Sequence, residues 1–291
     1  MFVTGATGLL GSKFMGLNSG FEIFGSYRSQ VIDDYNSKLF QLDVTDSEKS
    51  QKLIKKQSPD IIIHTAALTD VDYCENHKKE AKEVNVHGTE NIAKIAREIE
   101  AKMVYVSTDY VFDGKSGPYS EDDKPNPISY YGRTKLEGEN VIKKLGIDYL
   151  IVRTTVLFGC HPLGILNFAT WVIGKLTKKQ KINVVNDQFG NPTLADNCAE
   201  VILSILKNGK SGIYNVVGKD YVNRFDFACK IADFFNLDKS LIEPVTTAEL
   251  NQPAKRPKFG GLKTDKIEKE LNVKLLTIED SLRIMKGQMR I

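Results

Sequence analysis

A tyrosine and a lysine four residues apart are the side chains of this sequence best suited to proton transfer. Tyr131 and Lys135 lie in a segment whose pattern predicts a helix over Ser129–Leu145, and residues at positions i and i+4 share one helix face. A phenol is a useful acid only when its pKa, about 10 in water, moves toward neutrality. A neighbouring ammonium stabilises phenolate, so we expect Lys135 to lower the pKa of Tyr131. Because a tyrosine and a lysine often occur at this spacing by chance, the alternative is an ordinary pair of side chains on the surface of a helix.

A glycine-rich turn near the start of the chain predicts a phosphate-binding site. Its glycines stand three residues apart, after the apolar segment Phe2–Thr4 and before a helix expected over Leu9–Leu17. Small residues let the backbone approach a pyrophosphate, and the helix N-terminus offers free N–H groups and a positive dipole. An ordinary glycine-rich turn is the alternative, and the first strand is either short or the chain begins a few residues late. The residues expected to bind a dinucleotide here are Gly5, Thr7, Gly8, Leu9, Leu10 and Gly11.

The end of the second expected strand predicts which dinucleotide binds. A carboxylate at this place binds the ribose 2′-hydroxyl of NAD, whereas an arginine accommodates the 2′-phosphate of NADP. The segment Gly25–Ser29 contains Arg28 and Ser29 and no carboxylate. We therefore expect NADPH as the cofactor, with NADH as the second choice. The alternative is that Arg28 is a solvated loop residue.

The order of the elements that carry these residues predicts an α/β fold. Strands are expected at Phe2–Thr4, Phe21–Tyr27, Lys38–Leu42, Asp60–His64, Lys102–Ser107 and Tyr149–Arg153. The helices expected between them are Leu9–Leu17, Ser47–Gln57, Glu80–Ile99 and Ser129–Leu145. This alternation is typical of a Rossmann-type, doubly wound parallel sheet.

The alternation weakens after about residue 155, where glycines and prolines interrupt the pattern. Strands are expected there at Ile182–Val185 and Gly212–Val217, and helices at Leu166–Leu176, Ala195–Leu206 and Arg224–Phe235. Residues 1–155 are therefore predicted to form the nucleotide-binding core, to which later segments return. Residues 156–291 are predicted to form mainly a smaller, interleaved C-terminal substrate lobe.

Composition excludes several classes of protein. The net charge is +3 and no dense basic tract occurs, so we expect no nucleic-acid partner. No apolar run approaches the roughly 20 residues of a membrane span, and no signal-peptide pattern is visible, so we expect a cytoplasmic protein. The cysteines are widely spaced at Cys74, Cys160, Cys198 and Cys229, which predicts neither zinc nor any other metal site.

Four motifs carry a resemblance to a known protein family. They are Ser107–Gly114, Tyr130–Glu139, Asn186–Thr193, and the run His64–Ala67 followed by Val71, Asp72, Glu75 and Asn85. On these motifs the chain resembles the extended short-chain dehydrogenase/reductase family over residues 1 to about 260. Within that family it is most similar to the dTDP-4-dehydrorhamnose reductase branch.

The resemblance implies a reaction. Hydride would pass from C4 of a nicotinamide to C4 of a 4-keto sugar, with dTDP-4-dehydro-L-rhamnose as the substrate and dTDP-L-rhamnose as the product. Tyr131 would be the general acid, Lys135 its pKa modulator and ribose anchor, and Thr108 the hydroxyl that holds the substrate carbonyl. A nucleotide sugar is thus the implied partner, together with a second copy of the chain in a homodimer.

The resemblance also implies further binding residues. Asp43 and Val44 would border the adenine, and Ala66 and Ala67 would pass beneath the cofactor; a helix cap at Asp43 and simple packing of the alanines are the alternatives. Arg256 would bind the substrate pyrophosphate, unless it belongs to a solvated basic loop. Substrate contacts are expected at Asp109, Tyr110, Val156, Asn186, Gln188 and Arg256. Val156 stands where the family usually has an aromatic residue, which leaves the identity of the sugar open.

Two other functions fit the same motifs. One is an epimerase or dehydratase of nucleotide sugars. Dehydratases typically carry an Asp-Glu pair after the catalytic hydroxyl, whereas Asp109 and Tyr110 follow Thr108 here, and epimerases usually retain NAD, which Arg28 disfavours. The other is a non-catalytic partner like the regulatory β subunit of methionine adenosyltransferase. Retention of Thr108, Tyr131 and Lys135 favours an enzyme, because a binding subunit has no chemical need for all three.

Overall fold

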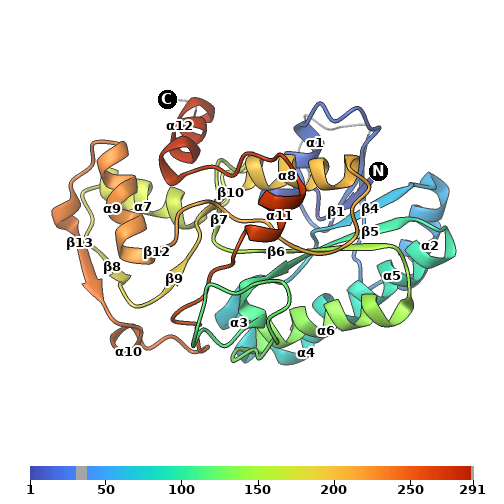
Figure 1. Ribbon diagram of the computed structural model, residues 1–291, viewed down its shortest axis with the longest axis horizontal. Helices are drawn as coiled ribbons and strands as arrows, with labels where there is room; N and C mark the ends of the chain where they lie inside the picture. Colours follow the sequence, from blue (N-terminus) through green and yellow to red (C-terminus); the bar gives the residue numbers. More distant parts are fainter. Residues whose placement is uncertain (31–37, 290–291) are drawn as a thin grey trace.

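A parallel sheet forms the centre of the molecule (Figure 1). The computed structural model describes residues 1–30 and 38–289, and within these residues the sheet has seven strands. In spatial order they are β11 (Gly212–Asn215), β6 (Tyr149–Thr154), β5 (Lys102–Thr108), β4 (Ile61–His64), β1 (Phe2–Thr4), β2 (Phe24–Tyr27) and β3 (Leu39–Gln41). Each neighbouring pair is parallel. The predicted Rossmann-type α/β class is confirmed.

Helices cover both faces of this sheet (Figure 1). One face packs against α1 (Leu9–Gly16), α8 (Ala195–Lys207) and α11 (Asp265–Glu270), and the other against α2 (Ser47–Gln57), α5 (Thr89–Glu98) and α6 (Tyr130–Leu145). The isoleucine run of β4 explains the two layers. Ile63 belongs to the apolar cluster of the first face and Ile62 to that of the second, as expected for a strand buried on both sides.

A smaller lobe is built around its own apolar cluster. Its helices are α7 (Phe168–Thr177), α9 (Arg224–Phe234), α10 (Thr247–Leu250) and α12 (Ile278–Gln288). Its strands pair as β8 (Ile182–Val185) with β13 (Ile242–Val245), β9 (Phe189–Gly190) with β12 (Val222–Asn223), and β7 (Leu157–Phe158) with β10 (Thr193–Leu194). The lobe lies beside the sheet, at the left of Figure 1. Strand β11 and helices α8 and α11 follow residue 155 yet pack with the sheet, so the chain passes between the two parts more than once.

The long helix expected over Glu80–Ile99 is interrupted. The chain forms α4 (Lys78–Lys82), a π-helical turn at Glu83–Gly88 and then α5. Asn85 lies in this turn. Its side-chain oxygen accepts a hydrogen bond from Leu68 N, and its Nδ2 donates to Leu68 O and to Thr134 Oγ1, both at 3.0 Å. π-Turns often occur at functional sites, and this one joins the loop after β4 to helix α6.

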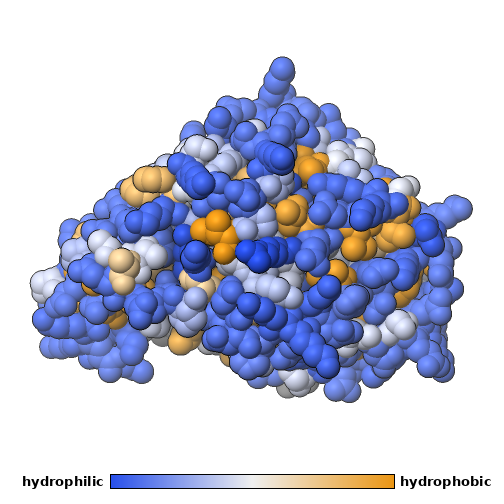
Figure 2. All heavy atoms as spheres, turned by 90° about the horizontal axis from the view of Figure 1, so that it is seen from below, coloured by the Kyte–Doolittle hydropathy of each residue, from blue (hydrophilic) through white to orange (hydrophobic). Residues whose placement is uncertain are grey.

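Several elements, most of them short, were not anticipated. They include α3 (Val71–Asn76), the 3₁₀ turns Asp109–Val111 and Lys239–Leu241, helices α10 to α12, and the two-residue strands. Seen from the side of α3, α4 and α6, the surface is mostly hydrophilic, with apolar atoms in separate patches (Figure 2). Among the described residues, no helix is both long and apolar enough to cross a membrane.

Candidate active site

The structure brings the three predicted catalytic side chains into one cleft. Thr108 ends β5, and Tyr131 and Lys135 lie on α6, which packs against that strand. Ser129 caps α6 by accepting a hydrogen bond from Gly132 N, so the helix begins one residue before Tyr131. All three side chains line a cleft of about 520 Å³. The cleft lies at the carboxyl ends of the sheet strands, where open α/β sheets bind their ligands.

Burial controls the charge of the tyrosine and the lysine. Burial raises the pKa of Tyr131 far above its usual value, and a hydrogen bond with Thr108 only partly opposes this. Burial also lowers the pKa of Lys135 to about 7, against the attraction of Glu139. The Lys135 Nζ lies 4.1 Å from the centroid of the Tyr105 ring. Our expectation of a lowered pKa for Tyr131 is therefore wrong in this structure, because the desolvation of the buried phenol dominates.

A buried ion pair supports the catalytic elements from below. Arg153 of β6 donates from Nη2 to Glu139 Oε2 at 2.8 Å and from Nε to Oε1 at 3.0 Å. Ser107 Oγ donates to the same carboxylate at 2.7 Å. Glu139 lies one helical turn after Lys135, and Ser107 directly precedes Thr108. The network therefore fixes the strand end and the helix that carry the catalytic side chains.

Asp109 connects the strand end to the smaller lobe. Its Oδ1 accepts from Thr108 Oγ1 at 3.2 Å, and its Oδ2 accepts from Gly261 N at 3.3 Å. Burial raises the pKa of this carboxyl group, and the Gly261 hydrogen bond opposes the shift. Tyr110 also lines the cleft, and its ring meets that of Tyr131 edge to face with centroids 5.8 Å apart.

The glycine loop has the close backbone contacts that a phosphate loop requires. Gly5 has a φ of +67°, and a Cβ there would lie 2.8 Å from Ala66 N. A Cβ at Gly11 would collide with the carbonyl oxygen of Gly5. In the described structure no side chain caps α1 at Gly8, so the first N–H groups of this helix are free to bind an anion.

The predicted cofactor residues line two adjoining hollows. Gly5, Thr7, Gly8, Arg28, Ser29, Asp43, Val44, Ala66 and Ala67 line a cavity of about 270 Å³. Leu9, Leu10 and Gly11 line the catalytic cleft, which shares Gly8, Thr65 and Ala67 with that cavity. Asp43 uses its Oδ1 to bind the backbone N and the hydroxyl of Thr45, whereas Asp46 caps α2. The residues fit an extended dinucleotide that runs from the adenosine side to the catalytic cleft.

The predicted substrate residues are not all in the cleft. Val156 lines it, with a φ of +47°. Arg256 instead forms a two-pronged ion pair with Asp72 at 2.6 and 2.7 Å. Gln188 donates to Thr247 Oγ1 at 3.1 Å, and Asn186 is exposed at the end of β8. These last three residues are not among those lining the cleft.

Among the cleft residues that the sequence did not indicate, two have titratable side chains. Arg224, the first residue of α9, lines the cleft, and its charge lowers the pKa values of Asp109 and Tyr110 against the effect of burial. His161 lines it from the loop after β7. Neither residue lies in a recognisable motif, so only the packing of the smaller lobe reveals them. Within the described residues, no group of three His, Cys, Asp or Glu side chains could hold a metal ion.

Comparison with known proteins establishes the family. The model of the RmlD substrate binding domain family matches residues 1–290. The chain belongs to this family. The predicted resemblance is thereby confirmed.

Three relatives show how wide the likeness is. A probable low-salt glycan biosynthesis reductase of Haloferax volcanii is 36% identical, over 98% of this chain and 97% of the relative. The methionine adenosyltransferase 2 subunit beta of Bos taurus is 32% identical, over 92% and 81%. The crystal structure of a dTDP-4-dehydrorhamnose reductase from Bacillus anthracis in complex with NADP superimposes with a TM-score of 0.89 and 31% identity, over 99% and 98%.

Proposed function

We propose that this chain reduces the 4-keto group of a nucleotide-linked deoxysugar with NADPH, converting dTDP-4-dehydro-L-rhamnose to dTDP-L-rhamnose. The observation that carries the proposal is the meeting of Thr108, Tyr131 and Lys135 in a cleft that continues into the glycine loop. As a member of this family, with a reductase that binds NADP among its structural neighbours, the chain is an NADP-dependent oxidoreductase.

The geometry assigns a task to each catalytic side chain. When bound, a reduced nicotinamide supplies the hydride. Burial keeps Tyr131 protonated at neutral pH, so its hydroxyl can donate a proton to the oxygen of the reduced carbonyl. Thr108, which lines the same cleft, holds that oxygen in place. The ammonium form of Lys135 lowers the free energy of the phenolate that Tyr131 becomes.

The pKa of Lys135 predicts a falling rate in mild alkali. Its ammonium form is complete well below pH 7 and is lost as the pH rises through about 7. We therefore expect kcat to fall about tenfold for each pH unit above that value. The measurement is kcat from pH 5.5 to 9.5 for the wild type and for Lys135→Arg, which stays charged. A wild-type profile that is flat across this range would remove Lys135 from the proton-transfer step.

Arg224 is the cation that we assign to the diphosphate of the substrate, in place of Arg256. Arg224 lines the catalytic cleft, and its guanidinium lies 5.1 Å from the centroid of the Phe168 ring. Across the described residues it forms no ion pair, whereas Arg256 already pairs with Asp72. A guanidinium binds phosphate oxygens through two N–H groups.

This assignment predicts a selective loss of nucleotide affinity. Arg224→Ala should weaken dTDP binding by about 10- to 100-fold, the equivalent of one hydrogen bond to a charged group, and leave NADPH binding unchanged. Calorimetric titration with dTDP measures the loss. Lys230→Ala, which removes an exposed cation from the same helix, is the matched control. The opposite ranking, with Arg256→Ala weakening dTDP binding and Arg224→Ala leaving it intact, would restore Arg256 as the diphosphate ligand.

The proposed substrate is tested with a panel of 4-keto sugars linked to dTDP, GDP and UDP. NADPH oxidation should be fastest with the dTDP-linked sugar. The competing role, regulation of a methionine adenosyltransferase, has a specific observation in its favour, the 32% identity to such a subunit. Co-purification of the chain with a methionine adenosyltransferase, together with no turnover of any sugar in the panel, would favour that role.

Two further expectations remain proposals. The cytoplasmic location rests on Cys74, Cys160, Cys198 and Cys229, which are all free thiols, because disulfides are rare in reducing compartments. The homodimer rests on the family resemblance alone.

A further inference from the structure

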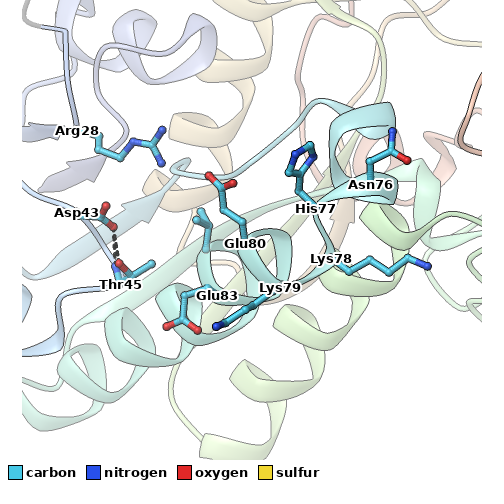
Figure 3. Close-up of a pocket in the computed structure, with 10 residues that line it drawn as sticks. Arg28, Asp43, Thr45, Asn76, His77, Lys78, Lys79, Glu80 and Glu83 are labelled. Atoms are coloured by element: carbon cyan, nitrogen blue, oxygen red, sulfur yellow. Dashed lines mark hydrogen bonds between the residues drawn. The ribbon is translucent and has the colours of Figure 1, made fainter.

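A second cavity opens beside the adenosine end of the cofactor cavity (Figure 3). Its volume is about 510 Å³, and it shares Arg28, Asp43 and Val84 with the cofactor cavity. Figure 3 shows Arg28 on one side and the carboxylate of Glu80, from α4, directed toward it from the other. The ribose end of a dinucleotide held by Arg28 would therefore lie within reach of a carboxylate that comes from a distant part of the chain.

Neighbouring side chains hold Glu80 in this direction. Tyr73 Oη donates a hydrogen bond to Glu80 Oε2 at 2.8 Å. The Tyr73 ring is itself stacked on His77, with centroids 3.7 Å apart and planes only 6° from parallel. The Glu80 hydrogen bond raises the pKa of Tyr73 and the charge of Arg28 lowers it, so the phenol lies within electrostatic reach of both charges.

None of the ion pairs among the described residues includes Arg28 or Glu80. Asp43, the other carboxylate near Arg28 in Figure 3, already accepts two hydrogen bonds from Thr45. Among the described residues, Tyr73 binds one oxygen of Glu80 and no hydrogen bond reaches the other. It is therefore the acidic group of this cavity best placed to meet an incoming ribose.

We infer that Glu80 sets the selectivity between NADPH and NADH, in opposition to Arg28. Arg28 attracts a 2′-phosphate, whereas a fixed carboxylate nearby repels its charge of about −2. The same carboxylate can accept a hydrogen bond from the free 2′-hydroxyl of NADH. The pair thus gives a site that binds both cofactors, with less preference for NADPH than Arg28 alone would give. This inference rests on the proposed cofactor function of the site.

The test is the substitution Glu80→Gln, which keeps the shape and the bond from Tyr73 and removes the charge. Kd values for NADPH and NADH are measured by fluorescence titration of the full chain at low salt and repeated at about 0.5 M salt. We expect NADPH to bind on the order of tenfold more tightly, because the substitution removes the repulsion between a carboxylate and a group with a charge of about −2. NADH should bind equally well or more weakly. The gain should shrink at high salt because the ions screen it.

Glu83→Gln is the matched control. Glu83 lines the same cavity, but Figure 3 shows its carboxylate directed away from Arg28, so its loss should change the ratio of the two Kd values by less than twofold. The inference would be overturned if Glu80→Gln changed the Kd values of both cofactors by the same factor, or if Glu83→Gln changed their ratio as much as Glu80→Gln does. Either result would leave the proposed function standing. Failure of the wild type to bind either cofactor would overturn both.

Discussion

Tyr131→Phe will lose most of its turnover while it still binds NADPH. The substitution removes only the hydroxyl, and the buried ring, which packs with Cys74 and Ala81, remains. Without the phenol, the developing oxyanion loses the proton donor that we assign to it, and general acid catalysis of this kind contributes about 10² to 10⁴ in rate. We expect kcat to fall by that factor, measured by single-turnover oxidation of NADPH with a verified substrate.

The distribution of the loss separates a chemical role from a structural one. An acid acts in the transition state, so kcat and kcat/KM should fall together, and the Kd of NADPH should stay within about twofold of the wild type. Tyr130→Phe, the neighbouring and half-buried tyrosine, is the control and should keep its rate. A near-normal kcat for Tyr131→Phe would show that another group donates the proton.

Removal of one partner of the buried Glu139–Arg153 pair will have the largest effect on stability. Both side chains have an exposed fraction of 1% or less. Glu139→Leu would leave the Arg153 charge buried and unpaired, which costs about 3–5 kcal/mol. Urea unfolding measures this loss in the free energy of unfolding. Since the cost comes from the orphaned charge, the double variant Glu139→Leu/Arg153→Met should recover much of it.

The same pair predicts sensitivity to acid. Burial raises the pKa of Glu139, but the hydrogen bonds from Arg153 and Ser107 more than offset this, so the net shift is downward. A carboxyl group whose pKa is lowered by folding adds stability above its unfolded pKa of about 4.3. That stability is lost as the pH falls through the lower pKa of the folded state.

The double variant also tests this account of the pair. If the losses in unfolding free energy of the two single variants simply add in Glu139→Leu/Arg153→Met, with no recovery, the account is contradicted.

Local pattern was enough to predict the parts of the site that local sequence builds. The glycine loop follows a strand and begins a helix, and its spacing alone indicates the tight turn seen at Gly5. The four-residue spacing of Tyr131 and Lys135 places them on one face of α6. Helix α2 matches its prediction residue for residue, because Asp46 caps its start and Pro59 follows two residues after its end.

Long-range contacts explain most of what was missed. Arg256 pairs with Asp72, a residue 184 positions earlier, and no local signal shows that its charge is already used. Arg224 reaches the cleft only because the smaller lobe folds back on the sheet. The pKa of Tyr131 is raised rather than lowered because the side chain is buried. Burial depends on the whole fold rather than on the neighbour four residues away. Two-residue strands such as β9 are too short to carry a periodic pattern.

Transfer of label from the cofactor to the sugar tests the central claim most directly. The chain is incubated with dTDP-4-dehydro-L-rhamnose and with NADPH that carries deuterium at both hydrogen positions of nicotinamide C4. A 4-ketoreductase should consume one NADPH for each sugar and place one deuterium at C4 of dTDP-L-rhamnose, and Tyr131→Phe should do neither at a comparable rate. Absence of deuterium from C4, with a wild type that binds NADPH and dTDP normally, would contradict the account.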